Sequence, residues 1–471
     1  MSEYAMSING KQVRSEAAED SFAVLNPATE EAFARAPECS ESQLSAAVEA
    51  AQRAFGSWRR DEDARRKALL TAAERLAEKT PEIARTLCLE QGKPLAQATG
   101  ELLSAVAQLK ATAGMPIPRE VTQDDAKAKI EITYRPFGVV AAITPWNFPV
   151  LIAMSKIAPA LLGGNTVVLK PSPYTPLATL ALGEVLNSVL PAGVLNVVSG
   201  GNDLGGQLTS HPLVRKISFT GSIGTGKKVA QAAATDLKRV TLELGGNDPA
   251  IVLPDADVQA LAARLYWSTF FNCGQICLAV KRIYVHETLF EPLTAALTKL
   301  AQSTVVGEGL DPKTQVGPLN NAMQLERVIA LTDDAKRRGA RVHAGGERLG
   351  RKGYFYPPTV LSNVTDDMRI VAEEQFGPVL PVLPYRDVED AVQRANATHF
   401  GLGASVWGRD LARAAEVAEQ IDSGTVWINQ HVALTHKAPF TGAKQSGIGR
   451  ASGRWALESF LQEHVINTNR G

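Results

Sequence analysis

The sequence has few cysteines, no excess of charge of either sign and no long apolar run. Its 471 residues contain only Cys39, Cys88, Cys273 and Cys277, too few for a disulfide framework, which predicts a protein of the reducing cytoplasm. Lys plus Arg and Asp plus Glu both number 49. This balance argues against a chain built to coat nucleic acid or an anionic membrane, so we expect neither as a partner.

Membrane insertion is also disfavoured by the sequence. A transmembrane helix needs about 20 uninterrupted apolar residues. The most apolar region, residues 138–169, is interrupted by Lys156 and three prolines, and therefore predicts a buried core. Residues 1–14 lack the charged and then apolar pattern of a signal peptide.

The order of apolar patterns predicts an α/β protein of about three domain-sized pieces. The first third looks helix-rich, with a 3.6-residue apolar stripe over 40–59 and similar patterns over 64–78 and 81–91. From residue 137, short β-rich runs alternate with helical segments, which predicts a parallel, doubly wound sheet that binds a nucleotide. A second alternating region begins near residue 250.

Two strand-like segments lie far apart in the sequence and outside both alternating regions. Residues 129–135 and 463–467 each alternate between apolar and polar side chains, as an exposed strand does. We expect them to form an accessory sheet that contacts another subunit, in a symmetric homo-oligomer.

Cys277 is a candidate nucleophile. It ends the segment Phe-Asn-Cys-Gly-Gln-Ile-Cys at 271–277, after a predicted helix. The alternative is that Cys277 is a small core hydrophobe, as most cysteines are. Cys273 precedes it by four residues, but no second pair completes a zinc site and the seven histidines are scattered, so we expect no metal.

Two polar residues at strand ends are further candidates. Glu243 ends an apolar strand and precedes two glycines, so it is either a desolvated general base with a raised pKa or a strand-end residue that faces solvent. Asn147 lies between Pro145 and Pro149, where its amide either donates to a developing oxyanion or fixes a rigid turn.

A glycine-rich segment, residues 219–226, lies between a predicted strand and a predicted helix. Its glycines would let the backbone approach a phosphate at the helix N-terminus. The strict G-x-G-x-x-G pattern is absent. Lys228 also replaces the Ser or Thr that ends a Walker A loop, which disfavours an ATP site.

Taken together, these segments resemble the NAD(P)-dependent aldehyde dehydrogenase superfamily from about residue 20 to the end. The resemblance rests on seven motifs in order: PWNFP at 145–149, VVLKPS at 167–172, FTGS at 219–222, LELGG at 242–246, FNCGQICLAVKR at 271–282, EEQFGPV at 373–379 and PFTGAKQSGIGR at 439–450.

The resemblance implies a Rossmann-like doubly wound cofactor domain, an α/β catalytic domain and a small β oligomerisation element. It places the dinucleotide-binding domain at 1–117 and 137–245, the catalytic domain at 246–445, and the oligomerisation strands at 118–136 and 446–471. The active site would then lie in the cleft between the two larger domains. We expect a homodimer or homotetramer.

The resemblance also implies how the reaction proceeds. Cys277 would attack the aldehyde, while its own backbone N–H and the amide of Asn147 hold the oxyanion. Hydride transfer to the nicotinamide would leave a thioester, and Glu243 would activate the water that hydrolyses it. Expected cofactor contacts, with NAD favoured over NADP, are Trp146, Lys170, Ser172, Gly221, Ser222, Gly245, Glu374 and Phe376, with Gln324 a further candidate from spacing alone.

Three positions depart from the pattern of many relatives. Pro173 stands where many NAD-preferring members carry a glutamate, which weakens the preference for NAD. In many relatives a lysine and a glutamate are thought to pass protons outward together. Lys156 matches the lysine, but Ala451 stands in the place of the glutamate, so the proton route would instead run through water. Thr441 stands where many relatives have a glycine, and we interpret this difference as a local adjustment of the backbone.

The expected substrate is a neutral, medium-length aliphatic or aromatic aldehyde. Ser155 stands where relatives that oxidise succinate semialdehyde carry an arginine. His431, His436 and Lys437, in the loop 430–437, either contact a polar tail of the substrate or lie at the surface, and we expect the surface. The alternatives are a semialdehyde dehydrogenase of the succinate semialdehyde type, an acyl transferase to coenzyme A or phosphate, which Glu243 disfavours, and a non-catalytic cofactor-binding relative. The substrate tunnel should be lined by Phe148, Leu151, Ser155, Ile276, Leu278, Leu434 and Phe440.

Overall fold

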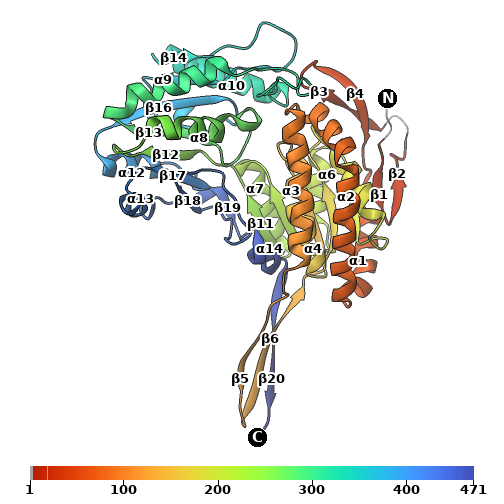
Figure 1. Cartoon of the computed structure of the whole chain (residues 1–471). Helices are drawn as coiled ribbons and strands as arrows, with labels where there is room; N and C mark the ends of the chain where they lie inside the picture. The colour runs from red at the N-terminus through yellow and green to blue at the C-terminus, as the bar shows by residue number, and fades with distance from the viewer. Residues whose placement is uncertain (1–3, 18–19) are drawn as a thin grey trace.

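A computed structural model describes residues 4–17 and 20–471, and it confirms the α/β class. The chain forms two lobes, each built on an open twisted sheet with helices packed against it, and a narrow β arm that projects from the body (Figure 1). None of the described helices is long and apolar enough to cross a bilayer.

The sheet of the first lobe has the strand order β19-β11-β10-β7-β8-β9-β1-β2. Strands β7 to β11 run parallel, while β1, β2 and β19 pair antiparallel at the two edges. This parallel centre is the predicted doubly wound sheet. The strands are β1 (Met6–Ile8), β2 (Lys11–Val13), β7 (Val139–Ile143), β8 (Thr166–Lys170), β9 (Leu195–Val197), β10 (Val214–Thr220), β11 (Arg239–Glu243) and β19 (Gly447–Ile448).

Helices of the first lobe bury an apolar stripe against this sheet. Ser40 caps the first helix: its side chain accepts from the Gln43 backbone N–H, and the Gln43 side chain accepts from the Ser40 backbone N–H. The helices are α1 (Glu41–Trp58), α2 (Glu62–Gln91), α3 (Leu95–Ala113), α4 (Pro149–Leu162), α5 (Leu177–Asn187), α6 (Asn202–Ser210) and α7 (Ile223–Thr235).

Two expectations for the first third were wrong. The separate helices predicted at 64–78 and 81–91 are one helix, α2, which continues through Pro81. Leu76 and Ile83, on either side of Pro81, are buried in the same core, so packing outweighs the backbone hydrogen bond that proline removes. The region also contains the hairpin β3 (Ser21–Asn26) and β4 (Glu31–Pro37), which helical periodicity did not reveal.

The second lobe has a sheet of order β14-β15-β16-β13-β12-β17-β18, parallel except for β14. Its two faces bury separate cores: Ile251 of β12 faces one, and its neighbours Ala250 and Val252 face the other. The strands are β12 (Asp248–Val252), β13 (Val280–His286), β14 (Arg341–Ala344), β15 (Thr359–Ser362), β16 (Val379–Tyr385), β17 (Gly403–Trp407) and β18 (Thr425–Ile428). The helices are α8 (Val258–Phe270), α9 (Glu287–Ser303), α10 (Ala322–Arg337), α11 (Arg369–Ala372), α12 (Val388–Asn396) and α13 (Leu411–Ala418).

The arm is the expected accessory sheet. Strands β5 (Arg119–Asp124), β6 (Ala128–Pro136) and β20 (Leu461–Asn469) pair antiparallel, with Leu461 opposite Pro136 at the base and Asn469 opposite Ala128 at the tip. The helix α14 (Gly453–Ser459) leads into β20 at the root of the arm (Figure 1). The two predicted strands therefore pair with each other within one chain. Their contact with another subunit, and the domain boundaries, stay predictions.

Candidate active site

The carboxyl ends of four neighbouring parallel strands bring much of the candidate site together. Thr220 at the end of β10 is in register with Glu243 of β11, and Ile143 of β7 is in register with Lys170 of β8. Such an edge is where doubly wound sheets bind dinucleotides. The segments that leave this edge carry Asn147, Lys170, Gly221 and Glu243.

Cys277 lies in the connection between α8 and β13, where the chain turns sharply. The short 3₁₀ turn Phe271–Gly274 holds Asn272 and Cys273 at positive φ of 51° and 57°. The side chain of Gln275 closes this turn by donating to the Asn272 carbonyl at 3.0 Å and accepting from the Asn320 backbone at 2.9 Å. Cys277 therefore follows a turn whose backbone is fixed by hydrogen bonds of Gln275, two residues before it.

Asn147 is tied directly to the loop that carries Cys277. Its side-chain Nδ2 donates to the carbonyl of Gln275 at 2.9 Å, and Asn272 Nδ2 donates to the Asn147 carbonyl at 3.1 Å. Lys93 Nζ donates to the same carbonyl at 2.8 Å and forms a buried ion pair with Glu101 at 2.6 Å. Asn147 is thus held next to the candidate nucleophile by two other segments, the Cys277 loop and the loop that carries Lys93.

Glu243 is buried rather than directed to solvent. It is 9% exposed, and neither carboxylate oxygen has a hydrogen-bond partner among the described residues. Burial raises the pKa of this carboxyl, and the positive charge of Lys156 opposes the shift. A carboxyl that is desolvated and free to accept a proton has the properties of a general base.

The Cys277 thiol is half-buried and held in its protonated form. Burial raises its pKa, and three carboxylates raise it further: those of Asp248, Glu374 and Glu243. The thiolate is the nucleophilic form of cysteine. Attack from Cys277 in this environment therefore needs a nearby group that accepts the thiol proton.

Residues expected at the nicotinamide end converge from both lobes. The rings of Trp146 and Phe376 meet edge to face, with centroids 5.3 Å apart. Glu374 accepts from the Gly246 backbone at 3.0 Å, and burial raises its pKa to about 7. A Cβ on Gly245 would lie 2.3 Å from the Glu374 carboxylate, so this close approach requires glycine.

The expected adenosine and diphosphate contacts lie along the same sheet edge. Ser222 caps α7 by accepting from the Thr225 backbone, and the Gly221 N–H is used within the sheet by the Glu243 carbonyl at 3.1 Å. Lys170 is 3% exposed, and burial lowers its pKa to about 8 while the Glu38 carboxylate opposes that shift. Ser172 accepts from the Tyr174 backbone at 3.3 Å.

An apolar cluster surrounds Cys277. Buried Ile276 and Leu278, its two neighbours in sequence, pack together with the partly buried Phe148 and Phe440. The structure therefore brings together four of the seven expected tunnel residues. Leu151 and Ser155 lie half-buried on α4, and the Ser155 hydroxyl donates to the Ile152 carbonyl of its own helix at 2.8 Å. Leu434 is 56% exposed and outside the cluster.

The expectation that His431 lies at the surface was wrong. Its imidazole is buried, donates from Nε2 to the Leu278 carbonyl at 2.7 Å, and lies 3.5 Å from the Asp248 carboxylate. It anchors the 430–437 loop to the residue after Cys277, whereas His436 and Lys437 are exposed as expected. A lone histidine in a loop carries no sequence signal for this burial.

Two further residues, Lys93 and Lys281, act on the site but were not singled out in the sequence. Lys93 supports Asn147. Lys281 is fully buried and donates to the carbonyls of Gly274 at 2.6 Å and Gly377 at 2.8 Å, which joins the Cys277 loop to the segment of Phe376. Gln324, considered for the ribose, instead donates to the carbonyls of Gln375 and Phe376. Lys281 lies inside a recognised motif, but its role depends on partners far away in sequence.

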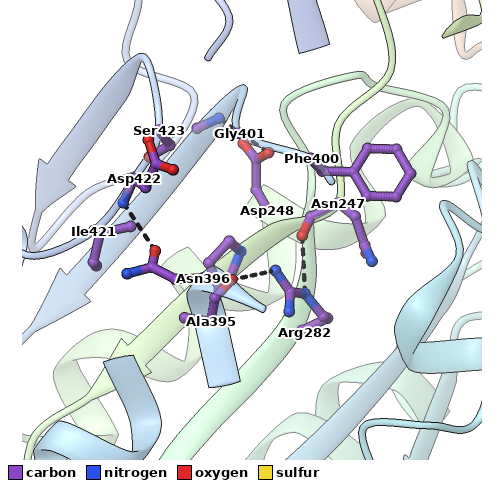
Figure 2. A pocket seen from close by; sticks show the side chains of 12 residues that line it. Asn247, Asp248, Arg282, Ala395, Asn396, Phe400, Gly401, Ile421, Asp422 and Ser423 are labelled. Atoms are coloured by element: carbon purple, nitrogen blue, oxygen red, sulfur yellow. Dashed lines mark hydrogen bonds between the residues drawn. The ribbon is translucent and has the colours of Figure 1, made fainter. Parts of the chain in front are cut away.

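Arg282, the last residue of the cysteine motif, has a packing role. Figure 2 shows its guanidinium reaching the backbone around a small cavity also lined by Asn247, Asp248 and Asn396. It donates to the Asn247 carbonyl at 3.0 Å and the Ala395 carbonyl at 3.1 Å. The cavity of about 10 Å³ has room for about one water molecule and not for a substrate.

Comparisons with known proteins agree with this architecture. The family model described as "Aldehyde dehydrogenase family" matches residues 13–466. Human retinaldehyde dehydrogenase 3 is 40% identical over 96% of this chain and 90% of its own. A 3-sulfolactaldehyde dehydrogenase of Pseudomonas putida is 40% identical over 97% of this chain and 95% of its own. The NAD⁺ complex of an aldehyde dehydrogenase from Bacillus cereus superposes with a TM-score of 0.97 at 37% identity, covering 100% of this chain and 97% of that one.

Proposed function

The chain belongs to the aldehyde dehydrogenase family, and we propose that it oxidises a neutral aldehyde to the carboxylic acid with NAD through a thioester on Cys277. The observation that carries this proposal is the meeting of Cys277, Glu243 and Asn147 at one sheet edge, with the Asn147 amide hydrogen-bonded two residues before Cys277. That set contains a nucleophile, a base and an oxyanion donor.

The first chemical step is attack by Cys277 sulfur on the aldehyde carbon. A carbon–sulfur bond forms, the carbonyl oxygen takes the negative charge, and the thiol proton passes to Glu243. Glu243 suits this role because it is close enough to raise the pKa of the thiol and its oxygens accept no other hydrogen bond among the described residues. The Asn147 amide and the Cys277 backbone N–H stabilise the oxyanion.

A nicotinamide cofactor held here would supply the hydride acceptor that converts the adduct on Cys277 to a thioester. The residues present fit that cofactor: Glu374 offers carboxylate oxygens to ribose hydroxyls, and the Trp146 and Phe376 rings offer apolar surface. At the other end, the start of α7 offers backbone N–H groups to a diphosphate.

The second step is hydrolysis of the thioester. Glu243 takes a proton from water as the water oxygen attacks the acyl carbon, and the carbon–sulfur bond breaks to release the acid and regenerate Cys277. Its raised pKa makes the carboxylate a stronger base than an exposed glutamate. A transfer of the acyl group to coenzyme A or phosphate would need no such base.

NAD is the proposed cofactor and NADP the alternative. Pro173 leaves the position three residues after Lys170 without a carboxylate. The Glu38 carboxylate nevertheless lies near Lys170, because its charge raises the pKa of Lys170 and so opposes the lowering caused by burial. Glu38 therefore supplies negative charge where the adenine ribose is expected to bind. Negative charge there opposes a 2′-phosphate.

The proposed substrate class follows from the lining around Cys277. The cluster of Ile276, Leu278, Phe148 and Phe440 is apolar throughout, and Ser155 offers no cation to a second carboxylate. A neutral aliphatic or aromatic aldehyde would bury its apolar surface against this lining. An anionic aldehyde would lose its hydration there without gaining a positively charged partner. Of the two relatives above, human retinaldehyde dehydrogenase 3 is named for an apolar aldehyde, and the Pseudomonas putida enzyme is named for a sulfonated aldehyde.

The experiment is to follow reduced cofactor while the purified protein is mixed with hexanal, benzaldehyde or succinate semialdehyde, and with NAD or NADP. We expect the highest kcat/KM with the two neutral aldehydes and NAD. A preference for succinate semialdehyde would overturn the substrate class. Cofactor binding without turnover of any aldehyde would favour a non-catalytic relative.

We further propose that the arm joins subunits of a homodimer or homotetramer, and that the domain boundaries follow those of the family.

A further inference from the structure

The segment 147–151, which enters α4 after β7, carries three residues of the candidate site. Asn147 is the proposed oxyanion donor, and Phe148 and Leu151 are expected tunnel residues. Phe148 occupies the N-cap position of α4, and its ring offers no hydrogen bond to the start of the helix. The first backbone N–H groups of a helix have no acceptor within it, so this start needs an acceptor from elsewhere in the fold.

Glu101, from α3, supplies that acceptor. Its Oε1 accepts from the Val150 N–H at 2.9 Å and from the Leu151 N–H at 3.1 Å. Its other carboxylate oxygen, Oε2, lies 2.6 Å from Nζ of Lys93, and both side chains of this ion pair are buried. The carboxylate that caps α4 is therefore itself held in place by a lysine.

Lys93 also contacts the segment directly, from the short connection between α2 and α3. Its Nζ donates to the Asn147 carbonyl at 2.8 Å and lies over the Phe148 ring, 3.9 Å from the ring centre. An ammonium in this position is attracted by the electron-rich face of the ring. Lys93 and Glu101 together thus hold the backbone at Asn147, the ring of Phe148 and the first turn of α4.

The contacts of this pair indicate a role other than stability. A buried ion pair is a poor source of stability, because the lost hydration of two charges offsets their attraction. Apart from the ion pair itself, the side-chain hydrogen bonds of Lys93 and Glu101 among the described residues all go to the segment 147–151. Within that segment, the Phe148 ring also packs against the apolar cluster around Cys277. The pair therefore joins one wall of the expected tunnel to the helical pair α2 and α3.

We propose that Lys93 and Glu101 are a positioning pair that selects aldehydes by shape and favours an aromatic ring beside Cys277. The inference rests on the proposed function, because it takes Phe148 as a wall of the aldehyde site. Two aromatic rings attract each other best in offset or edge-to-face arrangements, so an aromatic substrate gains most from a Phe148 ring of fixed orientation. A linear alkyl chain adapts its shape and gains little from that orientation.

The test removes both charges at once. Loss of one partner would leave the other charge buried and unpaired, which endangers folding. Lys93→Met/Glu101→Gln avoids this, because the glutamine carbonyl still accepts from the Val150 and Leu151 N–H groups. In this double variant we expect kcat/KM for benzaldehyde to fall about three- to tenfold more than kcat/KM for hexanal, the range that an aromatic pair contributes.

The comparison of two aldehydes separates Phe148 from Asn147. Any displacement of the Asn147 amide slows both aldehydes, so the ratio of their kcat/KM values reports on the Phe148 wall. The KM for NAD, which a general loosening of the site would also raise, should stay at the wild-type value. In a Phe148→Leu background, the double variant should leave the ratio unchanged, because effects that act through one residue are not additive.

Glu90→Gln is the matched control. Glu90 is also a buried carboxylate that caps a helix from a distance, since it accepts from the Leu177 N–H at 2.7 Å and the Ala178 N–H at 2.9 Å. The helix that it caps, α5, carries none of the expected tunnel residues. Glu90→Gln should therefore keep the wild-type ratio of benzaldehyde to hexanal.

Alkylation of Cys277 measures the same selection without turnover. In 2-bromoacetophenone and 1-bromo-2-hexanone, the same reactive group carries an aromatic or a linear tail, and the Cys277 sulfur displaces bromide from either. Mass spectrometry follows the rate of each addition. In Lys93→Met/Glu101→Gln, the ratio of the aromatic to the linear rate should fall by about the same three- to tenfold factor.

The outcomes are distinct. A fall of both ratios in the double variant, with Glu90→Gln and the Phe148→Leu background unaffected, supports the positioning pair. Ratios unchanged in the double variant, or an equal fall in Glu90→Gln, overturn it. A wild-type protein that is alkylated at Cys277 but oxidises no aldehyde would contradict the proposed function, and the alkylation ratios would still decide for or against the pair.

Discussion

The side-chain amide of Asn147 donates to the carbonyl of Gln275 at 2.9 Å, across 128 residues of sequence. This bond joins the turn after β7 in the first lobe to the Cys277 loop in the second. Asn272 and Lys93 both donate to the Asn147 carbonyl, so the position of the amide is fixed from two other directions. The proposed oxyanion donor and the proposed nucleophile thus form one preorganised unit.

Loss of the Asn147 amide should slow thioester formation. For Asn147→Ala we expect kcat to fall about 10²–10³-fold, the usual effect of removing one oxyanion donor. The burst of reduced cofactor should slow to the same extent, because the oxyanion develops before hydride transfer. Stopped-flow absorbance measures both rates. A normal burst in Asn147→Ala would show that the amide only fixes the turn.

Glu243 should control both deprotonation of the Cys277 thiol and hydrolysis of the thioester. Glu243→Gln keeps the shape of the side chain but accepts no proton. We expect a slower burst that still reaches about one equivalent of reduced cofactor per active site, because water can take the thiol proton less efficiently, followed by turnover slowed about 10²–10⁴-fold. Glu243→Asp, with its shorter reach, should retain part of the steady-state rate. Equal steady-state rates in Glu243→Gln and the wild type would contradict the role of the base.

The same base predicts the sign of the pH dependence. Burial raises the pKa of Glu243, so the fraction in the active, unprotonated form grows as pH rises through the neutral range. Wild-type steady-state turnover should therefore increase from acidic to mildly alkaline pH. Turnover of Glu243→Gln should lack this rising limb. A wild-type profile that falls over the same interval would be incompatible with a carboxylate base.

Lys281 should position the cofactor segment rather than take part in the chemistry. Its removal in Lys281→Met takes the donor from the Gly274 carbonyl and one of two donors from the Gly377 carbonyl, which also accepts from the Val379 N–H at 2.9 Å. An unsatisfied buried carbonyl costs about 1–3 kcal/mol. We expect a lower midpoint of urea unfolding and a KM for NAD that rises more than the KM for the aldehyde. Lys281→Arg, which retains donors, is the matched comparison. A KM for NAD unchanged in Lys281→Met would exclude this positioning role.

The cofactor preference should respond to charge at position 173. In Pro173→Glu we expect the ratio of kcat/KM for NAD to that for NADP to rise about tenfold or more, because a like charge beside a 2′-phosphate costs several kcal/mol. Pro173→Gln is the neutral control and should change the ratio much less. An equal change in both variants would attribute the effect to loss of proline.

The parts of the site that sequence revealed are those set by local pattern. Apolar runs alternating with helices predicted the parallel sheet, and parallel strands bring their carboxyl ends to one edge, which is why Glu243, Lys170 and Asn147 were found together. The motifs also indicated the family, which the comparison with known proteins confirmed.

The parts that sequence missed depend on contacts between distant segments. His431 was expected at the surface, but its binding to the Leu278 carbonyl across 153 residues buries it. Lys281 and Lys93 read as ordinary charged residues, and only the fold supplies the carbonyls and the carboxylate that surround them. Pro81 suggested a helix boundary, but packing on both sides of it kept α2 continuous.

The most direct test of the account is the mass of the protein after one turnover. Glu243→Gln, mixed with hexanal and NAD and quenched in acid, should gain the mass of one hexanoyl group, and peptide mapping should locate that group on Cys277. The Cys277→Ala variant treated in the same way should gain nothing and produce no reduced cofactor. An acyl group on another residue, or reduced cofactor formed in amounts equal to wild type by Cys277→Ala, would contradict the proposed thioester on Cys277.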